Sequence, residues 1–135
     1  MKTKTFLTIA SKGFIILSAI SLLSVSIMAF NNPQSVMDLV EVQLTNTDAC
    51  SSIRGIYGGV GLTICISLFY LLKNNMQLAL AFLSILWGSY ALSRILTIFI
   101  EGHLGNFGSQ WLVIESILCI IGCSLYVCNM SSNKS

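Results

Sequence analysis

The chain has 135 residues, of which 55% are hydrophobic and only 9% are charged, and its formal net charge is +2. A water-soluble domain carries about 25% charged residues, so this balance is typical of an integral membrane protein. Seven basic residues among five acidic ones form no basic surface, which excludes nucleic acid as a partner. The apolar runs leave no room for a soluble catalytic domain.

Four apolar runs are long enough to cross a hydrocarbon core, which takes about 20 residues of helix. Asn31, Asn32 and Pro33 end the first run, and a polar turn at 73–75 separates the second from the third. We therefore predict an all-α fold, a four-transmembrane-helix bundle that forms a single membrane domain over residues 1–135. The predicted spans cover residues 14–30, 53–72, 76–100 and 111–128.

The only long connection lies between the first two spans, over residues 34–52. It contains apolar residues at positions that suit one stripe of a short helix. We expect this helix to lie at the membrane surface, where it either packs over the ends of the bundle or acts as a lid. The apolar residues are Val36, Met37, Leu39, Val40 and Leu44.

The distribution of charges predicts the orientation, because cytoplasmic flanks carry an excess of Lys and Arg. The lysines fall on one side of a four-span arrangement and the acids and the histidine on the other. Both termini are therefore predicted to be cytoplasmic, in a multi-pass protein of the cell inner membrane. These residues are Lys2, Lys4, Lys12, Lys73 and Lys134 against Asp38, Glu41, Asp48, Glu101 and His103.

A cleaved signal peptide is the alternative interpretation of the first apolar run. The lysines before this run and Ala29 before its polar end fit such a peptide. The length of the apolar stretch favours retention as a span.

Ionisable residues in or beside the spans are the most informative, because a charge in hydrocarbon costs several kcal/mol unless it is paired or hydrated. Arg54 opens the second span, and Arg94 lies about 9 Å along the helix from Ile100. Glu101 follows Arg94 by one heptad, and Glu115 lies about one turn inside the fourth span. Two positive and two negative side chains at similar depth predict a mutually neutralising cluster, in which Arg94 pairs with Glu101 or Glu115.

Two further residues extend this candidate cluster. Tyr57 shares a helix face with Arg54. His103 lies in the outer loop, where it either titrates near neutral pH or is simply solvated. The cluster is either a ligand-binding site or a set of structural ion pairs that fix the helix register. Its members are Arg54, Tyr57, Arg94, Glu101, His103 and Glu115.

Glycines cover much of one surface at the start of the second span. Gly55 and Gly59 form a GxxxG pair, and Gly58 and Gly61 share the face of Arg54. We expect another span to approach this surface closely.

The five cysteines form no CxxC motif, so neither a thiol oxidoreductase centre nor a paired zinc-ligand motif is indicated. We predict no metal and no cofactor. The set is Cys50, Cys65, Cys119, Cys123 and Cys128, of which only Cys50 is expected outside the membrane.

The sequence RGIYGG at 54–59 resembles the pattern of the domain-of-unknown-function 4345 family. Ser93 with Arg94, the Glu101-Gly102 pair, and Glu115 in the last span complete the resemblance. The family comprises small bacterial four-helix membrane proteins, so the resemblance implies fold and location but no activity. An acid commonly precedes the first motif and a glycine commonly precedes the second arginine, whereas this chain has Ser52 and Ser93.

The function predicted from these features is that of a non-enzymatic binding or accessory subunit. Its outward-facing polar cluster would engage a lipophilic ligand, a lipid headgroup or a partner subunit, and the chain could also form a homo-oligomer. One alternative is a subunit of a quinone-linked oxidoreductase, which rests on a looser likeness to DoxX-type architecture. A small transporter is less favoured, because the first span lacks a membrane-embedded acid.

Overall fold

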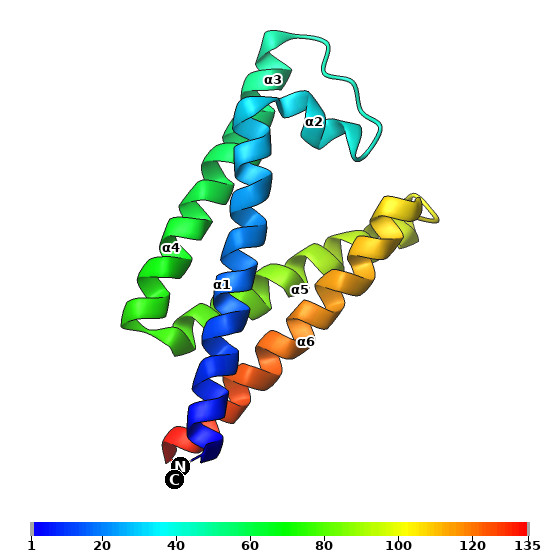
Figure 1. The fold of residues 1–135 in the computed structure, drawn as a ribbon. Helices are drawn as coiled ribbons and strands as arrows, with labels where there is room; N and C mark the ends of the chain where they lie inside the picture. Colours follow the sequence, from blue (N-terminus) through cyan, green and yellow to red (C-terminus); the bar gives the residue numbers. More distant parts are fainter. Residues whose placement is uncertain (1, 135) are drawn as a thin grey trace. The chain divides into compact units, whose positions relative to one another are not determined.

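Residues 2–134 are described in a computed structural model of the chain, and side chains are described for residues 4–132. Every regular element in this part of the chain is helical (Figure 1). The elements are α1 (Lys2–Asn31), α2 (Pro33–Asp38), α3 (Thr47–Ile53), the π-helix η1 (Arg54–Val60), α4 (Gly61–Asn74), α5 (Met76–Ile100) and α6 (Asn106–Lys134).

The predicted all-α fold with four membrane-spanning helices is confirmed. Four helical stretches are long and apolar enough to cross a membrane, which indicates a membrane protein. The third stretch has the predicted bounds, and the other three extend beyond the predicted spans into polar residues. The difference arises because apolar residues mark the hydrocarbon core, whereas capping residues determine where a helix ends. The stretches are Lys4–Asn31, Thr47–Asn74, Met76–Ile100 and Asn106–Ser132.

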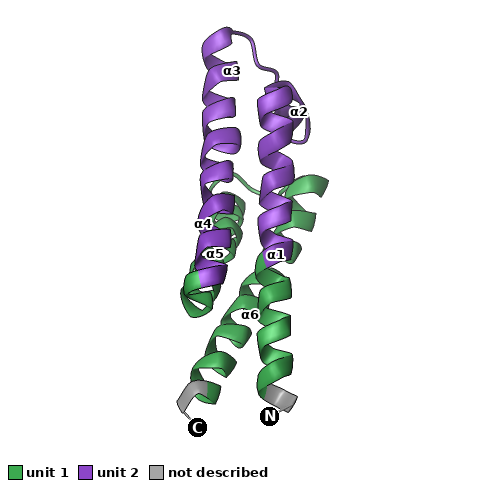
Figure 2. Cartoon of the chain, turned by 60° about the vertical axis from the view of Figure 1, so that its left-hand side comes forward, with its two compact units in different colours: residues 1–15, 74–135 green, residues 16–73 purple. Residues whose placement is uncertain are grey.

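The chain divides into two compact units (Figure 2). Unit 1 comprises Met1–Ile15 and Asn74–Ser135, and unit 2 comprises Ile16–Lys73. One boundary falls inside the continuous helix α1, and the other falls at the turn before α5. The arrangement as a single membrane domain stays a prediction, and each unit is described by itself.

In unit 1, α5 and α6 pack along each other (Figure 1). Small residues allow this close approach. The Cys119 thiol donates to the backbone oxygen of Ser84 at 3.4 Å, and a Cβ added at Gly88 would lie 3.1 Å from the Cys119 sulfur. A Cβ added at Gly122 would lie 2.7 Å from the Ser84 hydroxyl oxygen. The cysteine therefore acts here as a small packing residue.

In unit 2, α1 approaches the second span at Ser26. Its hydroxyl oxygen lies 3.0 Å from the backbone oxygen of Leu22 and 3.1 Å from that of Tyr57. A Cβ at Gly61 would overlap this hydroxyl, and a Cβ at Gly58 would lie 3.1 Å from the Phe30 ring. The close contact of the helices therefore leaves no room for a Cβ at Gly61 and little room for one at Gly58.

The other two predicted packing glycines lie outside this contact. A Cβ added at Gly55 or at Gly59 would meet no described atom within 4 Å. A close approach of α1 is therefore described at Gly58 and Gly61, and at Gly55 and Gly59 the approach of another span stays a prediction. The helical turn at this point is also not a regular one.

The irregular turn is η1, whose sequence is RGIYGGV. In a π-helix the backbone bonds run from residue i to i+5, which shifts the register of the following helix faces. The carbonyl of Tyr57 receives a bond from Ser26 on α1, so the widened turn is tied to the neighbouring helix. Sequence reasoning predicted an ordinary helix here and missed the π-helix.

The segment after α1 forms a short helix, as predicted, but a smaller one. Asn32 caps α2 by accepting a bond from the Gln34 N–H at 3.1 Å, and Pro33 occupies its first turn. Val36 and Met37 pack against Ala29, with Leu44 and Ile53 beside them. Leu39 and Val40 are exposed and fall outside the helix, so the predicted apolar stripe is only partly used. The place of α2 at the membrane surface stays a prediction.

The Gln34 side chain holds the chain that follows α2. Its amide nitrogen donates to an Asp38 carboxylate oxygen at 2.6 Å and to the backbone oxygen of Val42 at 2.9 Å. Its amide oxygen accepts from the Leu44 N–H at 2.8 Å. Glu41 adopts a positive φ of 58°, which reverses the chain between these contacts.

We expect Gly61→Ala to destabilise the protein, whereas Gly59→Ala should be neutral or slightly stabilising. The same methyl group overlaps Ser26 in the first case and enters open space in the second, and overpacking costs about 1–3 kcal/mol. Thermal unfolding in detergent, followed by tryptophan fluorescence, measures the difference.

The double variant Ser26→Ala/Gly61→Ala is the control for this mechanism. Without the hydroxyl, the nearest side-chain atom to the new methyl group is the Cβ of residue 26 at 3.6 Å, an ordinary van der Waals distance. The double variant should recover part of the lost stability. Equal stability of the Gly59→Ala and Gly61→Ala proteins would contradict the proposed contact.

Candidate functional site

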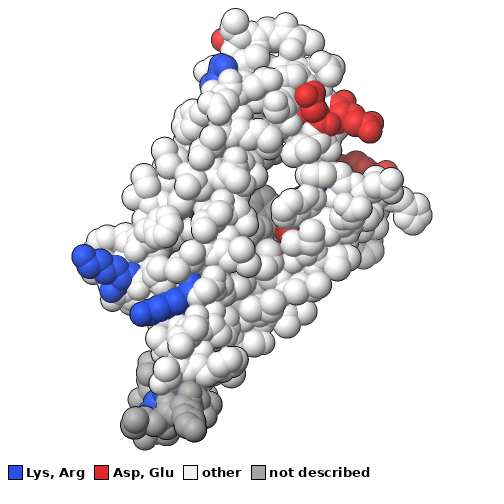
Figure 3. Space-filling model, viewed as in Figure 1, with Lys and Arg blue, Asp and Glu red and all other residues white. Residues whose placement is uncertain are grey.

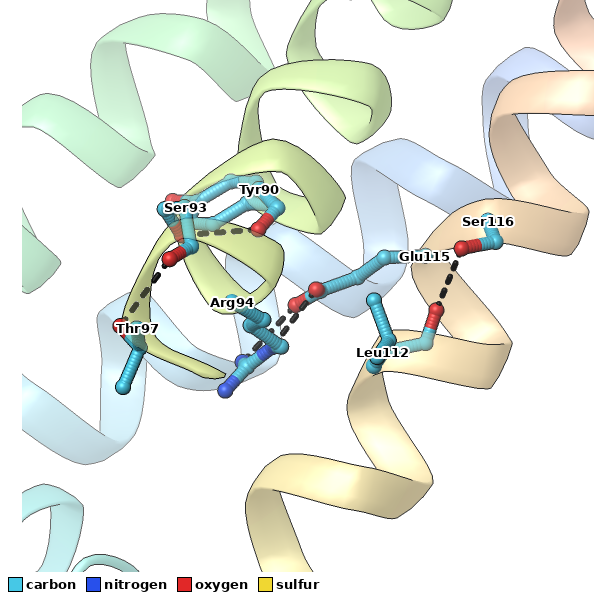
Figure 4. A network of polar contacts seen from close by, with 7 residues as sticks. All are labelled: Tyr90, Ser93, Arg94, Thr97, Leu112, Glu115 and Ser116. Atoms are coloured by element: carbon cyan, nitrogen blue, oxygen red, sulfur yellow. Dashed lines mark hydrogen bonds and ion pairs between the residues drawn. The ribbon is translucent and has the colours of Figure 1, made fainter. Parts of the chain in front are cut away.

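The candidate site in unit 1 is an ion pair between neighbouring spans. Arg94 on α5 and Glu115 on α6 point toward each other (Figure 4). The Nε of Arg94 donates to Oε2 of Glu115 at 2.6 Å, and Nη2 donates to Oε1 at 2.9 Å. This two-bond arrangement is the strong, directional form of an arginine–carboxylate pair.

The two partners differ in their exposure. The Glu115 side chain is 3% exposed, whereas that of Arg94 is 22% exposed. The carboxylate is therefore enclosed, and the accessible edge of the pair belongs to the guanidinium. An isolated buried carboxylate would be costly, so Arg94 supplies the counter-charge of Glu115 within the helix pair.

Aromatic rings line one side of the arginine. The guanidinium carbon of Arg94 lies 5.9 Å from the centroid of the Phe107 ring, within the range of a cation–π contact. The Phe107 and Trp111 rings follow each other along α6, with centroids 6.1 Å apart. Arg94 is thus held by charge on one side and by aromatic surface on another.

The hydroxyl groups beside the pair bond to their own helices. Ser93 donates to the backbone oxygen of Tyr90 at 2.7 Å, and Ser116 donates to that of Leu112 at 2.7 Å (Figure 4). Such back-bonding satisfies a hydroxyl in an apolar environment without using a side-chain partner. The two hydroxyl groups are therefore satisfied by their own helices. Arg94 and Glu115 bond to each other, and the exposed edge of the guanidinium stays accessible.

The predicted pairing of Arg94 with an acid is confirmed, and the acid is Glu115. Glu101, the other predicted partner, is exposed and forms the C-cap of α5, where its backbone N–H bonds to the Thr97 oxygen. His103 is exposed in the connection between α5 and α6. Because α5 ends at Ile100, Glu101 and His103 lie beyond the helix and outside the depth of the Arg94–Glu115 pair.

Arg54 and Tyr57 belong to unit 2. The Nε of Arg54 donates to the backbone oxygen of Phe30 at 3.3 Å, near the end of α1, where a positive side chain is favoured by the helix dipole. Both side chains are exposed, Tyr57 by 37%. The four-charge cluster stays a prediction, and the arrangement described within unit 1 is the Arg94–Glu115 pair alone.

Another buried polar contact in unit 1 was missed by sequence reasoning. The side chain of Asn129 donates from Nδ2 to the Ser11 hydroxyl oxygen at 2.9 Å and to the backbone oxygen of Leu125 at 2.7 Å. Asn129 lies just after the predicted fourth span (111–128), yet it is 7% exposed and Ser11 is fully buried.

The described residues offer no set of three or more metal-ligating side chains in one place. Cys65 is buried, and the other cysteines are free thiols at partly or fully exposed positions. The chemistry that the site itself supports is charge pairing and hydrogen bonding.

Comparison with models of known protein families shows to which family the chain belongs. The model of the family described as Domain of unknown function (DUF4345) matches residues 10–126. The chain belongs to this family. The match includes the RGIYGG motif, Arg94 and Glu115, so the predicted resemblance is confirmed. No curated protein and no solved structure matches the chain.

We expect Glu115→Gln to destabilise the protein by about 3 kcal/mol, because it leaves the arginine without its counter-charge. The double variant Arg94→Leu/Glu115→Leu should lie much closer to the wild type, since an apolar pair replaces both charges. Unfolding in detergent gives the free energies for this comparison.

Glu101→Gln provides the matched control. Glu101 is exposed, so this substitution should reduce the stability of the protein only slightly. In a double-mutant cycle, the losses of stability caused by Arg94→Ala and Glu115→Gln should be strongly non-additive, whereas those caused by Arg94→Ala and Glu101→Gln should add. Additive losses for Arg94 and Glu115 would show that the pair carries no interaction energy.

Proposed function

We propose that this chain is a non-enzymatic membrane protein whose Arg94–Glu115 pair forms a binding site for a membrane-embedded ligand. The observation that supports this function is the unequal exposure of the two partners, 22% for Arg94 against 3% for Glu115. Ionisable groups inside spans mark functional sites more often than other residues do, because lipid disfavours them.

The geometry of the pair leaves donors for a ligand. A guanidinium carries five N–H groups, and Glu115 takes two of them, through Nε and Nη2. Within the described side chains, the hydrogen bonds of Arg94 are these two. A pair that served only to fix the helix register would be expected to be enclosed on both sides.

The site also has an apolar wall, which suits a lipophilic molecule. The Phe107 ring lies against the guanidinium and provides this apolar surface. Binding sites for small molecules commonly combine such walls with a few placed polar groups.

We further propose that the protein lies in the inner membrane with both termini cytoplasmic. The position of Lys73 supports this orientation, because this lysine is exposed at the turn that ends α4. The exposed acids Asp38, Glu41 and Asp48 belong to the α2–α3 end of the same unit. On the face drawn in Figure 3, most of the surface carries no charged side chain.

Ligand retention tests the proposed binding function. The protein and its Arg94→Leu/Glu115→Leu variant are purified in parallel in a mild detergent, and mass spectrometry compares the small molecules and lipids that each retains. We expect at least one species enriched about tenfold or more with the wild type, as charge-assisted hydrogen bonds predict.

The matched control for this comparison is Lys73→Gln/Asp48→Asn, which removes one positive and one negative charge at exposed positions. Its extract should equal that of the wild type. Identical extracts from the wild type and the Leu/Leu variant would contradict a binding function at the pair.

Thiol labelling tests the proposed orientation. Cys50 lies in α3 and is partly exposed, and Cys128 lies near the end of α6 and is exposed. A membrane-impermeant maleimide applied to intact cells should label Cys50 and spare Cys128, with a Cys50→Ser variant as control. The opposite pattern would invert the orientation.

A further inference from the structure

The charge balance and depth of the Arg94–Glu115 pair restrict the kind of ligand that it can accept. This restriction rests on the proposed binding function and adds the chemical class of the ligand. We infer that the site takes an uncharged lipophilic molecule that presents a carbonyl oxygen to the free N–H groups of Arg94.

The first step concerns charge. Arg94 and Glu115 neutralise each other through two short hydrogen bonds of 2.6 and 2.9 Å. A third, negatively charged group would bring a net charge of −1 into an apolar environment, and the buried carboxylate would repel it. An uncharged acceptor adds hydrogen bonds to the guanidinium without this cost.

The second step concerns depth. The α5 helix has 25 residues, so it is about 37 Å long, against about 30 Å for the hydrocarbon core. Arg94 lies about 9 Å from the outer end of the helix, hence about 5 Å inside the hydrocarbon if the helix is centred. A lipid phosphate lies outside this boundary, whereas ester carbonyls and quinone rings reach below it.

The third step concerns the orientation of the donors. The two bonds to Glu115 use Nε and Nη2, so they fix the plane of the guanidinium. The N–H groups that remain include both of those on Nη1. In hydrocarbon each of them is costly without an acceptor, and a carbonyl oxygen with two lone pairs suits them.

Two sources supply this chemistry in a membrane: a quinone, and the ester carbonyl of an uncharged glyceride. The experiment therefore uses decylubiquinone and dioctanoylglycerol as probes, with dioctanoyl phosphatidylglycerol as the charged comparison and decylbenzene as a tail without a carbonyl. Delipidated full-length protein in a neutral detergent is equilibrated with each probe, and native mass spectrometry gives the dissociation constants.

We expect at least one uncharged carbonyl probe to bind the wild type and to bind the Arg94→Leu/Glu115→Leu variant about tenfold or more weakly. The Lys73→Gln/Asp48→Asn control should bind like the wild type. Whether the quinone or the glyceride binds more tightly identifies the source of the carbonyl.

Three results would overturn the inferred ligand class. Tighter binding of phosphatidylglycerol at the pair would show a charged ligand, and the proposed binding function would still stand. Equal binding of the carbonyl probes to the wild type and the Leu/Leu variant would place their site elsewhere. Absence of binding by either carbonyl probe would reject the class outright, while the retained molecules in the wild-type extract test the binding function separately.

Discussion

The hydrocarbon interior offers no hydrogen bonds to a polar group, so each polar group inside a span must find its partner within the protein or in a ligand. This constraint governs the contacts of both units. Glu115 is enclosed and pairs with Arg94, and Asn129 bonds to Ser11. Ser26 reaches the backbone oxygen of Tyr57. These contacts join helices that apolar packing alone would leave free to slide, because lipid tails compete equally well for apolar surface.

The π-helix shows how the same constraint shapes the backbone. A widened turn changes which carbonyl groups find a partner within their own helix, and a neighbouring hydroxyl satisfies one of them at Tyr57. The glycines in and just after the RGIYGG motif have unequal roles in this arrangement. Gly58 and Gly61 make room for α1, whereas Gly55 and Gly59 face open space. The motif therefore combines an irregular turn with a helix contact.

The sequence was sufficient for the spans and for one of the two helices in the connection. Apolar runs of the right length predict spans because the bilayer sets that length, and the bounds 76–100 agree with α5. The charge count also predicted that Arg94 has an acidic partner, since an unpaired guanidinium is costly at this depth. The choice between Glu101 and Glu115 depended on where α5 ends and how α6 packs against it, and neither follows from spacing along one helix.

The features of the structure that the sequence did not predict have a common physical origin. GxxxG spacing assumes a regular α-helix, whereas Arg54–Val60 form a π-helix, which no pattern of residue types predicted. The role of Asn129 was not predicted, because its partner, Ser11, lies at the far end of the chain. Contacts of this kind arise only once helices are packed, so a pattern within one segment cannot reveal them.

The binding function proposed for the Arg94–Glu115 pair would join binding to helix packing, because the same guanidinium would serve both. Its bonds to Glu115 hold α5 and α6 in register, and its open edge depends on that register for its direction. A ligand that accepts hydrogen bonds from this edge binds the packed state and not a state in which the pair is broken. By mass action such a ligand stabilises the α5–α6 contact. A site built on an interhelical ion pair therefore links ligand occupancy to the stability of the helix pair without any moving part.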